Sequence, residues 1–372
     1  MNELKGLGPI LPGMVTVKPS EAEPLNRPDL RHQSAPDPSV AEGEACEKGS
    51  LQKREVFEVP ENVNFFEIST KLGDIEVVAG DFQKTRLIRD IEIKLPENEA
   101  RALLAKLGGL SPDVNGIIMK FTEPALNINT QNPDGSVTIP GFQMGKIVAG
   151  RVTVHRGGNV GNVNTRNMTT LNGQVISGGE VPQGVQMTVK YRLEIPSGKG
   201  GSLTLDSASG NIKVENTNGN ASVRSASGNV ELLNIVGRVD LITTSGDISI
   251  SGANCENMQI ESNSGDVDVE SSRGKLEIIT RSGGVRITNQ TGEITAKTKS
   301  GEVRVEGELA NDVALSTTSG EITVIAQEGI SVSARSLSGD VRNKLGHSPD
   351  SPIHIIVTSV SGDITVRKLL EY

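Results

Sequence analysis

The sequence predicts an all-β fold: a single-stranded β-solenoid (β-helix) of 18–19-residue coils with two strands each, plus one short capping helix. Three observations predict it. A Ser-Gly pair recurs at a nearly constant spacing between Ser209 and Gly362. Apolar and polar residues alternate after each pair with a period of two, which is typical of strands. Aromatic residues make up only 2% of the chain, as suits a thin core of Val, Ile and Leu.

Residues 1–53 precede any such pattern and are rich in Pro, Glu, Ser and Asp. This composition cannot bury a core and predicts a disordered tail. The N-terminus lacks a basic region followed by an apolar run, so we expect no signal peptide and a cytoplasmic location. Cys46 follows Glu-Gly-Glu-Ala, which argues against a lipoprotein anchor. No window approaches about 18 apolar residues, so we expect no transmembrane segment.

Residues 54–126 predict N-terminal strands and the capping helix. Alternating apolar residues favour strands near 57–59, 65–68 and 87–95. The segment 72–77 reads Leu-Gly-Asp-Ile-Glu-Val, and we interpret it as an early, isolated copy of the later repeat.

The helix is predicted over 96–107. Pro96 stands at its start, acidic residues occupy its first turn, and a Gly-Gly pair follows its end. Leu103, Leu104 and Leu107 share one face. We therefore expect this helix to cover a sheet edge or one end of the solenoid.

Residues 127–186 form an insertion rich in Asn and Gly. Extra strands with long turns and a mobile loop are both compatible with this composition, and a loop of this length is usually functional or disordered. The insertion carries the cationic grouping that we take as the candidate contact surface, which consists of Arg151, His155, Arg156 and Arg166.

The repeat array extends over 187–372. Spacings between successive markers are 18, 18, 19, 18, 18, 19, 19 and 23 residues, and a looser turn lies near the middle of each period. Self-similarity of this kind indicates stacked repeats, each stabilised by its neighbours. The marker glycines are Gly210, Gly228, Gly246, Gly265, Gly283, Gly301, Gly320, Gly339 and Gly362.

Three residues before each marker glycine stands a Ser or Thr, and we expect this hydroxyl column to form a ladder of hydrogen bonds along the solenoid axis. Its members are Ser207, Ser225, Thr243, Ser262, Thr280, Thr298, Thr317, Ser336 and Ser359.

The residue after each marker glycine is usually acidic or an amide. We expect these side chains to accept backbone N–H groups of their own turn. The alternative is a cation such as Ca²⁺, held between Asp247 and Asp266 or between Glu321 and Asp340. The members of this acid column are Asn211, Asn229, Asp247, Asp266, Gly284, Glu302, Glu321, Asp340 and Asp363.

The repeats Ser-Gly-Asp-Ile-Ser-Ile at 245–250 and Ser-Gly-Asp-Ile-Thr-Val at 361–366, preceded by Tyr-Arg-Leu-Glu-Ile-Pro-Ser-Gly at 191–198, resemble the bacterial putative-adhesin β-solenoid family, a domain family of unknown function. The resemblance implies a right-handed or flattened β-helix and a non-enzymatic role. It also implies the cell surface as an alternative location. That family defines no catalytic residues to carry over.

Composition narrows the function further. A formal charge of −9 argues against nucleic acid as a partner and does not favour an anionic membrane surface. Two cysteines and four dispersed histidines exclude a metal site built from several of these residues. We expect no cofactor and no enzymatic activity, and instead a binding or scaffold role toward a protein or a surface polymer.

Two alternatives stay open. The first is a carbohydrate-active β-helix enzyme, which would need paired carboxylates and usually aromatic platforms. The second is a self-assembling filament, since solenoid ends expose strand edges that can pair in a homo-oligomer.

Overall fold

The computed structural model describes residues 44–47, 50–95, 97–124, 138–139, 142–143, 169–171, 174–177 and 186–369. The chain divides into units 1–37 and 38–372, and all described residues lie in the second. Most of the predicted tail and most of the insertion lie outside the described residues. The tail boundary at residue 53 is too late, however, because strands already occupy 44–47 and 50–58.

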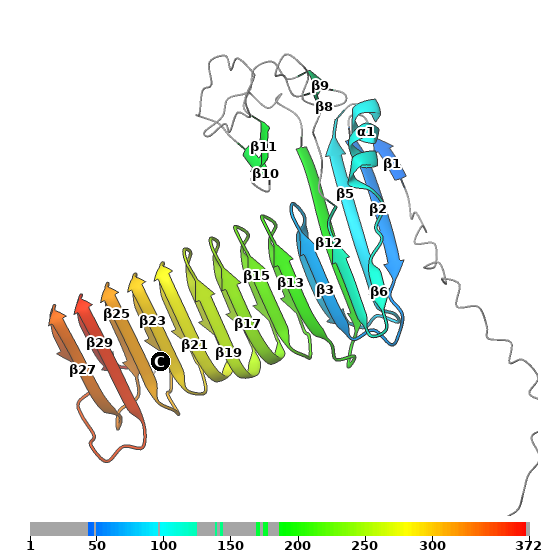
Figure 1. Ribbon diagram of the computed structural model, residues 1–372. Helices are drawn as coiled ribbons and strands as arrows, with labels where there is room; N and C mark the ends of the chain where they lie inside the picture. The colour runs from blue at the N-terminus through cyan, green and yellow to red at the C-terminus, as the bar shows by residue number, and fades with distance from the viewer. Residues whose placement is uncertain are drawn as a thin grey trace, which may run out of the picture. The chain divides into compact units, whose positions relative to one another are not determined.

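The repeats form two stacked sheets, a 14-stranded sheet A and a 12-stranded sheet B (Figure 1). In spatial order, sheet A consists of β1 (Glu44–Glu47), β2 (Ser50–Glu58), β5 (Arg86–Lys94), β12 (Gln186–Pro196), β4 (Asp74–Gly80), β14 (Ile212–Glu215), β16 (Val230–Leu233), β18 (Ile248–Ser251), β20 (Val267–Glu270), β22 (Val285–Thr288), β24 (Val303–Glu306), β26 (Ile322–Ala326), β30 (Ile364–Lys368) and β28 (Val341–Asn343).

Sheet B faces the viewer in Figure 1. In spatial order it consists of β27 (Ser331–Ser338), β29 (His354–Ser361), β25 (Val313–Ser319), β23 (Ile294–Ser300), β21 (Arg273–Ser282), β19 (Asn254–Ser262), β17 (Val236–Thr243), β15 (Ala221–Ser225), β13 (Ser202–Ser207), β3 (Phe65–Thr70), β7 (Ile118–Thr122) and β6 (Asp113–Asn115). Two further short pairs are β8 (Thr138–Ile139) with β9 (Phe142–Gln143) and β10 (Thr169–Leu171) with β11 (Gln174–Ser177).

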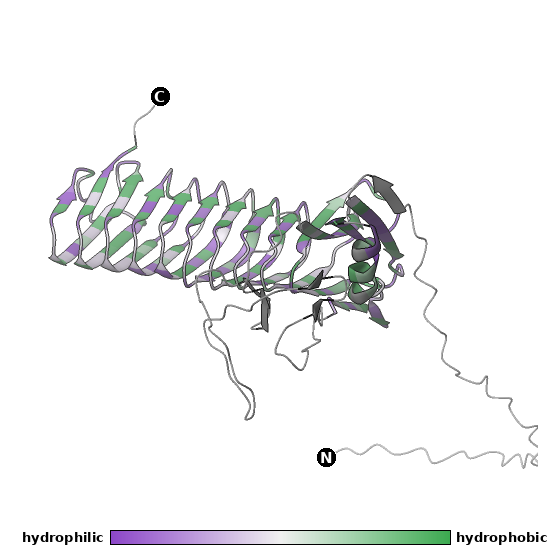
Figure 2. Cartoon of the chain, turned by 90° about the horizontal axis from the view of Figure 1, so that it is seen from above, coloured by the Kyte–Doolittle hydropathy of each residue, from purple (hydrophilic) through white to green (hydrophobic). Residues whose placement is uncertain are grey.

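Each coil contributes one strand to each sheet, and equivalent residues of neighbouring coils pair in parallel. Val230 pairs with Ile248, and Ile248 pairs with Val267. Residues of these rows are fully buried between the sheets, whereas the intervening polar residues point outward, as the alternating bands along the stacked strands in Figure 2 show. The predicted two-strand β-solenoid is confirmed.

The solenoid begins earlier in the sequence than the boundary at residue 187. Strands β3 and β4 form a coil of the stack, because β3 pairs with β13 and β4 pairs with β14. Segment 72–77 is therefore not an isolated copy of the repeat. Ile75 stacks directly on Ile212, and the long sequence between them forms the cap and the insertion.

The last coils do not stack in sequence order. Strand β29 lies between β25 and β27, and β30 lies between β26 and β28. The C-terminal coil thus occupies the penultimate position, and the coil of β27 and β28 is the end of the stack. The unusual marker spacing of 23 residues spans the connection that makes this reversal.

An antiparallel cap extends sheet A beyond the first coil. Strand β5 pairs antiparallel with both β2 and β12. Helix α1 (Glu97–Leu107) contacts β2 and buries Ala100, Leu103 and Leu107, with Leu104 partly buried. The predicted helix and its apolar face are confirmed.

Candidate binding site

The marker glycines are required because adjacent coils approach very closely at this turn. A Cβ added at Gly228 would lie 2.0 Å from the carbonyl oxygen of Gly210 in the neighbouring coil. At Gly246 the backbone also has a φ of 122°, which side chains rarely adopt. Any side chain in this column would therefore push two coils apart.

The acid column links neighbouring coils along the axis. Asn211 Oδ1 accepts the backbone N–H of Asn229 at 2.9 Å, Asn229 Oδ1 accepts that of Asp247 at 2.9 Å, and Asp247 Oδ1 accepts that of Asp266 at 2.9 Å. The expectation that these side chains bond their own turn is wrong. They satisfy the N–H groups of the next coil, and Asn and Asp perform this role equally.

The hydroxyl column mainly bonds within its own turn. Ser207 Oγ and Ser225 Oγ each donate to the carbonyl of the marker glycine three residues later, at 2.8 Å. Thr280 and Thr298 are buried, and their hydroxyls have no partner among the described residues. The expected axial ladder of hydroxyls is therefore not the general pattern, although Ser336 Oγ does donate to Gly362 of the neighbouring coil at 2.9 Å.

The structure separates one of the two predicted cation pairs. Glu321 and Asp340 are not in neighbouring coils, because the coil of Asp363 lies between them. Asp247 and Asp266 are neighbours, and one oxygen of Asp247 is already occupied by a backbone N–H. Within the described ranges, no group of three or more His, Cys, Asp or Glu residues could hold a metal.

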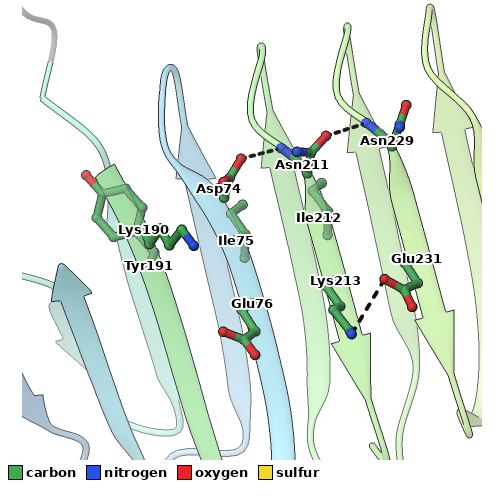
Figure 3. A pocket seen from close by; sticks show the side chains of 10 residues that line it. All are labelled: Asp74, Ile75, Glu76, Lys190, Tyr191, Asn211, Ile212, Lys213, Asn229 and Glu231. Carbon is green, nitrogen blue, oxygen red and sulfur yellow. Dashed lines mark hydrogen bonds and ion pairs between the residues drawn. The ribbon is translucent and has the colours of Figure 1, made fainter. Parts of the chain in front are cut away.

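A recess of about 440 Å³ lies on the outer face of sheet A, where the cap meets the first coils (Figure 3). Strands β12, β4, β14 and β16 and their preceding turns form it. Its lining is mainly polar and consists of Asp74, Ile75, Glu76, Lys190, Tyr191, Asn211, Ile212, Lys213, Asn229 and Glu231.

Charges of both signs alternate across the recess. Lys213 lies 2.8 Å from Glu215 and 3.6 Å from Glu231. The hydrogen bond to Glu215 and the charge of Glu231 raise the pKa of Lys213, although partial burial opposes the shift. Lys190 and Glu76 form no ion pair with another described residue, so they remain available to a partner.

A buried polar network lies behind the recess. Tyr191 Oη donates to Glu123 Oε1 at 3.1 Å, and Glu123 Oε2 accepts the N–H groups of Lys71 at 2.5 Å and Leu72 at 2.9 Å. Burial, followed by the charge of Glu123, raises the pKa of Tyr191, so its phenol stays protonated. The ring of Tyr191 packs on Phe121 with centroids 5.0 Å apart. This network fixes the first turn of the solenoid against the cap.

A second buried pair holds the cap itself. Arg89 is fully buried, and its Nε donates to Glu55 Oε2 at 2.7 Å. Its Nη2 also donates to Glu55 and to the carbonyl of Gly108, just past α1, at 2.5 Å. The pair therefore connects β5, β2 and the end of the helix. Because it is enclosed in the cap, it has a structural role.

A family model described as Toastrack DUF4097 matches residues 163–367, just over half of the 372 residues. The chain belongs to the Toastrack DUF4097 family. No functionally curated protein matches the sequence. The Toastrack match covers all coils from β13 onward but leaves out the first coil and most of the cap.

Solved structures similar to this Toastrack chain come from bacteria. A putative cell adhesion protein from Clostridium sporogenes has 11% identity and a TM-score of 0.21, covering 86% of this chain and 100% of its own. A putative adhesin from Parabacteroides merdae has 10% identity and a TM-score of 0.28, with 86% and 96% covered. A putative lipid binding protein from Parabacteroides distasonis has 13% identity and a TM-score of 0.29, with 85% and 97% covered.

The predicted contact residues Arg151, His155, Arg156 and Arg166 lie outside the described residues, so that surface stays a prediction. The sequence did not indicate the recess, because its lining comes from segments 74–76, 190–191 and 211–231. The available signal was the outward register of each strand, once 74–76 is placed in the stack. No described helix has the length and apolar character needed to cross a bilayer.

Proposed function

We propose that this Toastrack protein is a non-catalytic binding or scaffold protein that contacts a protein or surface polymer through the recess of sheet A. One observation carries the proposal. Arg192, Glu76, Lys213 and Glu231 occupy consecutive positions across β12, β4, β14 and β16, so that positive and negative charges alternate on a rigid face. A partner with charges of both signs at strand spacing, such as a folded protein, complements this row.

Binding is favoured over glycan cleavage by the state of the acidic groups. Glycosidases place two carboxylates on opposite sides of the scissile bond. Here Asp74 Oδ1 accepts the N–H of Asn211 at 2.8 Å, and Glu231 faces Lys213, which leaves Glu76 as the unpaired acid of the recess. The aromatic lining residue, Tyr191, is fully buried and offers no ring face to a sugar.

The test compares the full chain with a Lys190→Glu, Lys213→Glu variant. Both proteins are immobilised and probed with a glycan array and with fractionated proteins of the source cells. We expect the variant to lose bound partner at least tenfold, because two attractive contacts become repulsive. A matched control, Arg238→Glu with Lys275→Glu on sheet B, changes the net charge equally and should retain the partner.

Equal binding by the recess variant would exclude this surface. Shortening of any arrayed glycan would instead support the enzyme alternative. A surface-polymer partner requires display outside the cell, and fractionation of the cells distinguishes that location from a cytoplasmic one.

A further inference from the structure

The outer face of sheet B changes its chemistry along the stack. In the upstream strands, outward positions include Asp206, Asp240 and Glu261, all carboxylates. From β23 onward, the outward positions within β23, β25, β29 and β27 carry no carboxylate. The border lies at β21, where Glu277 is the acidic residue.

Exposed cations gather on the downstream part. Lys297 and Lys299 lie on β23, Arg281 lies beside Lys299 on β21, and Arg335 lies on β27. None of the four forms an ion pair with another described residue. They are separated by about one coil length in the sequence, so only the stacking of coils brings them onto one face.

Aliphatic side chains are exposed among these cations. Leu337 is 80% exposed, Ile356 52%, Val360 48% and Ile279 42%, and together they are four of the nine large hydrophobic residues exposed in the described ranges. Ile279 pairs with Lys297 across neighbouring strands. A soluble surface rarely concentrates such side chains without a partner.

These eight residues define the cationic–aliphatic face. It spans five neighbouring strands, β21, β23, β25, β29 and β27, or about 19 Å at ordinary strand spacing. Its strands run side by side in Figure 1, whereas the recess belongs to sheet A. The face is therefore a separate surface from the one proposed above.

We propose that the cationic–aliphatic face binds an anionic lipid surface. Each Lys or Arg near such a surface is attracted to acidic headgroups, and aliphatic side chains enter the boundary between headgroups and acyl chains. The net charge of −9 does not oppose this, because charges beyond about 10 Å are screened at moderate salt. An acidic polymer would use the cations but would leave Leu337 and Val360 unburied, so lipid explains more of the face.

The experiment is flotation of the full chain with vesicles of phosphatidylcholine alone or of equimolar phosphatidylcholine and phosphatidylglycerol. We expect the protein to float with the acidic vesicles only and to be released by high salt. Lys297→Gln with Lys299→Gln should lower the partition coefficient at least tenfold. Leu337→Ser with Val360→Ser should lower it several-fold while the salt dependence stays unchanged.

Two controls remove the same charge elsewhere. Arg224→Gln with Arg238→Gln, on the upstream half of sheet B, should float like the parent. Lys190→Gln with Lys213→Gln, in the recess, should also float like the parent, so the outcome is independent of the proposed function. Thermal unfolding of each variant confirms that it is folded.

Equal flotation with both vesicle types would overturn the proposal, as would wild-type flotation of the Lys297 and Lys299 variant. Soluble poly-L-glutamate provides the remaining arm. If it binds the protein as well as vesicles do, and the Leu337 and Val360 variant is unaffected, the face is a site for an acidic polymer and the lipid proposal fails.

Discussion

At the scale of single residues, the marker turn divides its tasks among three columns. Glycine permits close approach of the coils, the residue after it connects to the next coil, and the hydroxyl residue closes the turn itself. The sequence identified these columns correctly but reversed the bonds of two of them. Spacing shows which residues stack, but it does not show whether an oxygen such as Asp247 Oδ1 points along the axis or back into its turn.

Replacing Gly228 with Ala tests the close approach. Its Cβ would meet the carbonyl of Gly210, so one coil must shift, and we expect a loss of about 3 kcal/mol in the free energy of unfolding. Gly109→Ala is the control, because nothing lies within 4 Å of its added Cβ. Urea unfolding measures both. A stable Gly228→Ala protein would contradict the stacking at this turn.

Asp247 separates the axial hydrogen bond from the cation hypothesis. Asp247→Asn keeps the acceptor for Asp266 N–H and should leave stability unchanged, whereas Asp247→Ala should cost about 1 kcal/mol. We expect the melting temperature of each protein to be the same in EDTA and in millimolar Ca²⁺. A Ca²⁺-dependent rise in the wild type that is absent from Asp247→Ala would establish a cation site instead.

At the scale of elements, the cap shows what local sequence cannot supply. The helix over 97–107 was predicted because its start, face and end are local signals. The Arg89–Glu55 pair was not, because it joins strands far apart in the sequence. Likewise, segment 72–77 was recognised as a repeat but not as part of the stack, since more than 130 residues separate it from its partner strand at Ile212.

Removing one member of the buried cap pair should be costly. Glu55→Ala leaves the fully buried Arg89 guanidinium without its carboxylate, and we expect a loss of about 3 kcal/mol or more. The double variant Glu55→Leu, Arg89→Met removes both charges and should be more stable than Glu55→Ala alone. Chemical denaturation gives both values. If the double variant is the less stable one, the pair contributes net stability.

At the scale of the whole molecule, stacking creates surfaces that no sequence window contains. Lys297 and Lys299 are adjacent in the chain, but their proximity to Arg281 and Arg335 depends on coil order. The reversal at the C-terminal end was not predictable, because all repeats carry the same marker and any two of them can pair. Repeat identity therefore predicted the fold class but not the order of the last coils.

The two ends of the stack differ, which bears on the filament alternative. One end is closed by the antiparallel strands β2, β5 and β12 and by α1, whereas the other ends at β27 and β28. Continued head-to-tail growth requires matching parallel edges at both ends. We therefore expect static light scattering to show no growth in mass beyond a small oligomer as concentration rises. A mass that increases without limit would support the filament.

Distances along sheet B test the stacked, reversed order on which both proposed surfaces depend. Spin labels at Ser222 and at Ala314, Ile356 or Ser333 occupy one outward row. The stack predicts separations of about 24, 29 and 34 Å in that order, in equal steps of one strand spacing. A shorter distance to Ser333 than to Ile356, or broad distributions without equal steps, would contradict it.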